Sequence, residues 1–164
     1  MLGKISKGIY DRKMVFNLKY ITEFMKLARL AIDIKNNGIE GFIKKTCNCS
    51  RETENFDAFT EEILILYKLF NNRIVDFILS LSCLKRSLVV FFIANKYGVN
   101  ISFKMGIKNL LPGVSDYKFS GHAWVEIDNE PFMETLPVKK YTTIYSVSNS
   151  ENDYNNSNMK KENY

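Results

Sequence analysis

Cys83 and His122 are the two residues of this 164-residue chain whose types and settings suggest chemistry. His122 is the only histidine, and Cys83, one of three cysteines, stands where a helix is expected to begin. The thiolate is the nucleophilic form of cysteine, and it is favoured by the positive end of a helix and by a neighbouring imidazolium. An imidazole can take the thiol proton and later give it to a leaving amine. The pair suggests a cysteine nucleophile with a histidine base; the plain alternative is a small buried thiol and an unrelated surface histidine.

The helices that must position Cys83 are indicated by the spacing of apolar residues. We predict helices over about 16–34, 39–45, 57–79 and 83–97. The first should end near Gly38, which tolerates the left-handed conformation of a helix end. Asn71-Asn72 is a poor helix interior and marks either a break or an exposed turn. Ser80 or Ser82 is expected to cap the helix that begins at Cys83.

The strands that must carry His122 follow the helices. They are predicted over about 99–108, 122–128, 132–136 and 141–147. Apolar and polar residues alternate strictly over 99–108, which is typical of a half-buried strand. The order indicates an α+β domain, with N-terminal helices and a central Cys-bearing helix packed on a small antiparallel sheet. Residues 1–147 should form this domain, and the Asn-rich segment 148–164 a disordered tail.

Composition limits the classes of function. The net charge is +5, but no basic run with interleaved aromatic residues and no zinc-finger spacing is present, so a nucleic-acid partner is not expected. The longest wholly apolar run near the centre, Leu88–Ala94, is too short for a membrane span of roughly 20 residues. The polar, basic start of the chain has no secretory signal, which favours the cytoplasm. Cys47 and Cys49 are interpreted as ordinary loop thiols in a reducing compartment, so neither a metal nor another cofactor is expected.

Two short motifs resemble a known family. Cys83–Leu88 reads C-L-K-R-S-L, and His122–Glu126 reads H-A-W-V-E. In this order and spacing they resemble the transglutaminase-like cysteine peptidases of lasso-peptide biosynthesis, the B proteins, in their split form. The resemblance covers about residues 16–147, and it implies a transglutaminase-like, papain-like fold. Its catalytic triad would use Cys83 as nucleophile and His122 as base, with the Cys83 backbone N–H in the oxyanion hole.

The same resemblance implies partners. The substrate would be the leader of a ribosomally made precursor peptide, and a separate ATP-dependent cyclase would close the freed core. No GxxxxGK[ST] phosphate loop is present in this chain, so nothing indicates that it handles ATP. About 15 residues precede the first expected helix, too few for the leader-binding domain of fused relatives. A separate small leader-binding protein is therefore expected.

The third member of the triad is implied at Glu134, twelve residues after His122, where the family has aspartate. Glu126 and Asp128 share a strand face with His122, but at about 3.3 Å per residue they lie roughly 13 and 20 Å away. A residue on the next strand must orient the ring. Regular pairing across a two-residue turn would put Glu134 on the wrong face. We therefore expect an odd-numbered loop or a bulge near Asp128.

Two other functions stay open on the same fold. A scaffold that binds a peptide without cutting it is favoured by Glu134 at the position of the aspartate. A thiol acyltransferase would pass the acyl group from Cys83 to an amine instead of water.

Overall fold

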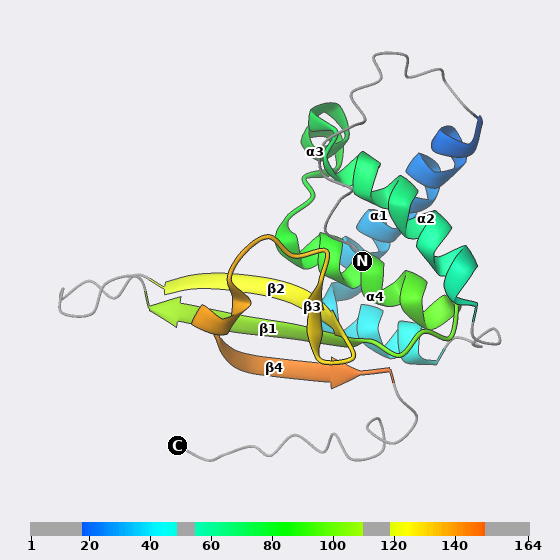
Figure 1. Ribbon diagram of the computed structural model, residues 1–164. Helices are drawn as coiled ribbons and strands as arrows, with labels where there is room; N and C mark the ends of the chain where they lie inside the picture. Colours follow the sequence, from blue (N-terminus) through cyan, green and yellow to red (C-terminus); the bar gives the residue numbers. More distant parts are fainter. Residues whose placement is uncertain (1–17, 49–54, 110–118, 150–164) are drawn as a thin grey trace.

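The computed structural model describes residues 18–48, 55–109 and 119–149. Its elements, in chain order, are α1 Leu18–Cys47, α2 Phe56–Phe70, α3 Arg73–Leu79, α4 Cys83–Lys96, β1 Ser102–Asn109, β2 Phe119–Ile127, β3 Glu130–Phe132, the 3-10 turn η1 Val138–Lys140 and β4 Thr142–Ser148. The strands form one antiparallel sheet in the order β3-β2-β1-β4. Figure 1 shows this sheet on one side of the molecule and the helices on the other, with α4 next to the sheet. The predicted α+β architecture is confirmed.

The helix boundaries follow local signals in the sequence. Gly38 has φ 67° and separates two helical parts of α1, as its expected role at a helix end requires. Asn71 and Asn72 mark a true break, because they cap the end of α2 and the start of α3. The cap of α2 is Asn55, whose side chain accepts from the N–H of Ala58, and not one of the residues at the predicted start near 57.

Helix α4 is the centre of the core. Its buried apolar side chains pack against α1 on one side and against β1 and β2 on the other. Phe91 of α4 and Phe103 of β1 are fully buried, with ring centroids 6.2 Å apart. Among the described helices, none alone has the length and apolarity to cross a membrane; α3 and α4 pass that test only together, and the chain bends by 96° between them.

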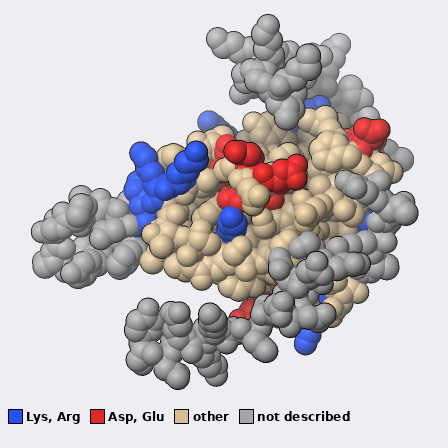
Figure 2. All heavy atoms as spheres, turned by 60° about the horizontal axis from the view of Figure 1, so that its bottom comes forward, with Lys and Arg blue, Asp and Glu red and all other residues tan. Residues whose placement is uncertain are grey.

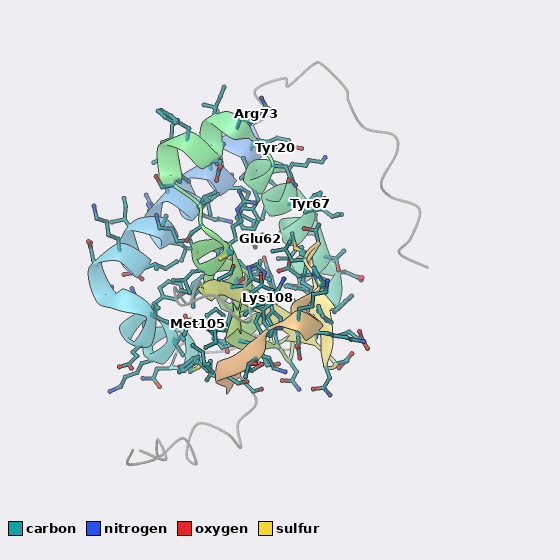
Figure 3. The ribbon with its side chains drawn as sticks, turned by 90° about the vertical axis from the view of Figure 1, so that its left-hand side faces the viewer. Tyr20, Glu62, Tyr67, Arg73, Met105 and Lys108 are labelled. Atoms are coloured by element: carbon teal, nitrogen blue, oxygen red, sulfur yellow. The ribbon has the colours of Figure 1, made fainter. Side chains whose placement is uncertain are left out.

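A polar network fixes the end of α4 that lies away from Cys83. Glu62 of α2 is buried in the helical layer (Figure 3), where it accepts a hydrogen bond of 2.6 Å from the Tyr97 hydroxyl and pairs with Lys96. Burial raises the pKa of Tyr97, and the hydrogen bond to Glu62 raises it further. Burial alone would lower the pKa of Lys96, but Tyr97 and Glu62 together raise it. These contacts join α2 and α4 at the C-terminal end of α4.

The folded region extends slightly past the boundary expected at residue 147. Strand β4 includes Ser148, and the Asn149 side chain is buried against the backbone of Val99 and Ile101. Two residues assigned to the tail therefore belong to the domain. The rest of the predicted tail, from residue 150, lies outside the described residues.

Candidate active site

Cys83 is the first residue of α4, as the sequence predicts. Ser82, and not Ser80, is the N-cap: its Oγ accepts from the N–H of Lys85 at 3.4 Å. The thiol is half-buried. The first N–H groups of a helix have no intrahelical acceptor, so the Cys83 N–H can serve as a donor to a developing oxyanion.

Ser87 ties the cysteine helix to the histidine strand. It lies one helical turn after Cys83, and its buried Oγ donates to the carbonyl of Ala123 at 2.9 Å. Ala123 is the neighbour of His122 along β2. This buried hydrogen bond, together with the apolar packing of α4 on β2, fixes the spacing between the elements that carry the thiol and the imidazole.

Aromatic rings enclose His122. Trp124 is nearly parallel to the imidazole, with centroids 6.2 Å apart, and Tyr141 lies 5.4 Å from it. Gly106, opposite His122 on β1, leaves room for this arrangement. A Cβ there would lie 3.0 Å from the nearest atom of the Trp124 ring and 2.9 Å from the Thr142 carbonyl oxygen. The side chain of His122 is only 8% exposed, so the packing of its neighbours limits the orientation of the ring.

Glu134 contacts His122, the pairing that the resemblance implied. Glu134 Oε2 lies 2.7 Å from His122 Nε2, and both side chains are largely buried. The other oxygen, Oε1, accepts the backbone N–H groups of Thr135 and Leu136, both at 2.8 Å. Because both carboxylate oxygens are hydrogen-bonded, Glu134 is held in one orientation toward the ring. Glu126, on the face of His122, bonds instead to Trp124 and to a lysine of β1.

The sequence analysis expected an odd-numbered loop or a bulge near Asp128 to bring Glu134 to His122, and this expectation was wrong. The β2–β3 turn is the two-residue turn Asp128-Asn129, with φ of 53° and 63°, and pairing is regular through Phe132. The predicted third strand over 132–136 is also wrong, since β3 ends at Phe132. Met133 has φ 55°. This left-handed residue takes the chain out of the strand, so the alternation of faces no longer applies to Glu134.

Met133 gives a prediction that separates backbone strain from loss of apolar volume. A β-branched residue is strongly disfavoured at positive φ, whereas an unbranched one of similar size is tolerated better. Met133→Ile should therefore lower the free energy of unfolding by a further amount on the order of 1 kcal/mol relative to Met133→Leu. Urea denaturation of both variants measures this difference. Equal stability of the two variants would show that the conformation of Met133 is not constrained.

A cavity of about 410 Å³ brings the three candidate residues together: Cys83, His122 and Glu134 all line it. In the described part of the chain, no hydrogen bond joins the thiol to the imidazole; such catalytic contacts are often long before a substrate binds. Because Nε2 faces Glu134, Nδ1 is the nitrogen left to exchange a proton with the thiol. The arrangement can therefore activate a thiol and stabilise an imidazolium.

Of the other two cysteines, the one that the structure describes does not line this cavity. Cys47 is half-buried at the end of α1, and Cys49 lies outside the described residues. Within the described ranges, no group of three or more His, Cys, Asp or Glu side chains comes together in a way that would hold a metal ion. On the face in Figure 2, basic and acidic side chains form small neighbouring groups, and the described residues there make no continuous basic surface.

Fold and cavity together define a class: an α+β domain with a cysteine at the start of its core helix and a histidine–carboxylate pair on the adjoining sheet. Residues 71–146 match the family model described as the transglutaminase-like superfamily. This segment, a little under half of the chain, is thus similar to transglutaminase-like proteins, a similarity compatible with a cysteine peptidase or an acyltransferase. Cys83, His122 and Glu134 all fall within it. No curated protein and no solved structure gives a significant match to the chain.

Three features of the site were not predicted from the sequence: the position of Tyr141, the conformation of Met133 and the hydrogen bond of Ser87. The sequence analysis placed Tyr141 in a strand and gave it no role. Its contact with His122 depends on the path of the chain through η1, which ends just before it, and no sequence pattern predicts that path. No sequence pattern predicts the left-handed conformation of Met133 either, because methionine rarely adopts it. The buried partner of Ser87 could have been sought, since a serine on an apolar helix needs an acceptor.

Proposed function

We propose that this protein is a cysteine peptidase that removes the leader from a ribosomally made, lasso-type precursor peptide. The proposal rests on the hydrogen bond between Glu134 and His122 in the cavity that Cys83 also lines. A carboxylate, an imidazole and a helix-start thiol are the parts needed to form and hydrolyse a thioester. The lasso assignment rests on the two motifs at Cys83–Leu88 and His122–Glu126.

The reaction would proceed in two steps. In the first, His122 Nδ1 takes the thiol proton while the sulfur of Cys83 attacks the scissile carbonyl, and the oxyanion is bound by the Cys83 N–H. The imidazolium then protonates the leaving amine as the C–N bond breaks, which leaves an acyl-thioester. In the second, His122 takes a proton from water, hydroxide adds to the thioester, and the thiol leaves with that proton. Glu134 holds the ring and stabilises its charged form in both steps.

The partners follow from the proposed substrate. A separate leader-binding protein would present the precursor, and an ATP-dependent lasso cyclase would use the amine that cleavage releases. Cleavage of the leader would thus supply the nucleophile for the cyclase, which makes the order of the two reactions obligatory.

The products of one mixture distinguish the possible activities. The protein is incubated with candidate precursors and leader-binding proteins from neighbouring reading frames, and the peptides are weighed by mass spectrometry. Cleavage that disappears in Cys83→Ala is the expected result. A Cys83-dependent gain of mass by an added amine would instead indicate acyl transfer. Unchanged peptide that still binds would indicate a scaffold, and either result would overturn the peptidase proposal.

The other two thiols provide the matched control. Cys47→Ser and Cys49→Ser should both leave cleavage intact, because the proposal assigns the nucleophile to Cys83 and Cys47 does not line the cavity. Loss of cleavage in one of these variants, with its fold preserved, would show that the nucleophile has been assigned wrongly.

A further inference from the structure

We propose that Arg86 is a positioning residue for Cys83: its guanidinium holds the turn between α3 and α4 and so fixes the thiol and its backbone N–H. This inference rests on the proposed function, since it assigns a role relative to the nucleophile. Arg86 lies one helical turn after Cys83 and lines the same cavity. The positioning role is inferred from the hydrogen bonds that Arg86 makes to the turn and to α3.

Three consecutive carbonyls of the turn are bonded by side chains from the first turns of α4. Arg86 Nε donates to the carbonyl of Leu81 at 3.0 Å. Lys85 Nζ donates to the carbonyls of Leu79 and Ser80, each at 3.0 Å. The turn contains a strained residue, because Ser80 has φ 47°. The chain immediately before Cys83 is therefore held by side chains that follow it.

The charges of Lys85 and Arg86 run against the usual preference of a helix start. The N-terminus of a helix favours acidic side chains, yet the first turn of α4 has none, while Lys85 and Arg86 lie close by. Cations placed there are unfavourable, because they face the positive end of the helix dipole. A local preference broken in this way is most often associated with a functional site. Here the two cations instead donate hydrogen bonds to the carbonyls of the turn that precedes Cys83.

Arginine is specifically suited to this position. While Nε bonds to Leu81, the terminal nitrogen of Arg86 bonds to Asp76 of α3 at 3.0 Å, and the guanidinium lies 5.8 Å from the centre of the Phe70 ring. The pair with Asp76 is partly exposed and so adds little stability. Its effect is geometric: one planar group joins α3, the turn and α4. Lysine would retain the charge, but it has no planar group that could bond the Leu81 carbonyl and Asp76 in this fixed geometry.

The test uses two readouts in a background carrying Cys47→Ser and Cys49→Ser, where Cys83 is the one thiol left. The first readout is the rate of alkylation by iodoacetamide at neutral pH, which needs no peptide. The second is kcat and KM for precursor cleavage. We expect Arg86→Lys and Arg86→Gln each to slow alkylation by about 10-fold and to lower kcat at least as much, with KM within about 3-fold. Circular dichroism checks that each variant is folded.

Three further variants complete the design. Arg73→Gln removes a positive charge from the end of α3 opposite the turn, at an exposed position (Figure 3), and should change neither rate. Asp76→Ala removes the acceptor of the Arg86 terminal nitrogen while Arg86 stays in place, and it should slow alkylation of Cys83 by several-fold, whereas Asp76→Asn keeps an oxygen acceptor and should slow it less. Equal alkylation rates in the wild type and Asp76→Ala would count against the positioning role even where an Arg86 variant fails to fold.

The outcomes separate this inference from the proposed function. Full alkylation and turnover in Arg86→Lys would show that charge alone matters and would overturn the positioning role. A rise in KM with unchanged kcat would instead make Arg86 a substrate contact. If the wild-type protein cuts no precursor, the peptidase proposal fails, but the alkylation rates still decide the role of Arg86.

Discussion

Replacing His122 by alanine should lower kcat for Cys83-dependent cleavage by about 10³-fold, within the range that general acid–base catalysis contributes. The imidazole is the one group placed to take the thiol proton and to protonate the leaving amine, and within the described residues no other histidine can replace it. KM should change little, because the ring is packed between Trp124 and Tyr141 and is largely buried. Steady-state kinetics with the identified precursor measures both constants.

A matched variant controls for the packing. Tyr141→Phe keeps the aromatic ring against His122 and should retain activity within about 3-fold, since the tyrosine contributes here through its ring. Added imidazole should partly restore His122→Ala, because the vacated space opens onto the cavity. Turnover of His122→Ala near the wild-type rate would exclude the histidine as the base.

Glu134→Gln is expected to be more damaging than Glu134→Ala. In the wild type, Oε1 accepts two backbone N–H groups and Oε2 faces the imidazole. The amide of glutamine has one oxygen, which the two N–H donors will take, so its NH₂ must face His122 Nε2. Nε2 then becomes an acceptor, and the ring proton moves to Nδ1, the nitrogen that should receive the thiol proton. We expect kcat to fall by about 10³-fold in Glu134→Gln and by about 10²-fold in Glu134→Ala.

The decisive result is which of the two variants, Glu134→Gln or Glu134→Ala, has the lower kcat. Alanine leaves the imidazole free to adopt either tautomer, although it no longer orients the ring. A value of kcat for Glu134→Gln equal to or above that of Glu134→Ala would contradict the assignment of Nδ1 to the thiol. Glu134→Asp should lose about 10-fold, because the shorter side chain cannot reach Nε2 while also bonding the backbone of Thr135 and Leu136.

The elements that hold the site were largely predictable because each has a local signal. Ser82 caps the start of α4, and Gly98, just after its end, adopts the left-handed conformation that glycine favours there. Strict alternation predicted the core-facing side of β1, where Phe103 is fully buried. Position along a helix or strand is thus a property of a few neighbouring residues, and the sequence shows it directly.

The approach of Glu134 to His122 was not predictable from pairing rules. Those rules assume that a strand continues, and here it stops at Phe132 because Met133 turns the backbone. The two-residue turn at Asp128-Asn129 was a visible alternative, since both residue types tolerate positive φ. The contact depends on the backbone of one methionine, a residue whose type carries no such preference.

The rates of alkylation of two thiols in one protein test the central claim most directly. Cys83 and Cys47 are both half-buried, so exposure alone predicts similar reactivity. If His122 activates Cys83, iodoacetamide at neutral pH should modify Cys83 at least about 10-fold faster than Cys47. His122→Ala should remove that advantage and leave the rate at Cys47 unchanged. Equal rates in the wild type, or a fast Cys83 without His122, would contradict the proposal that these residues form a catalytic pair.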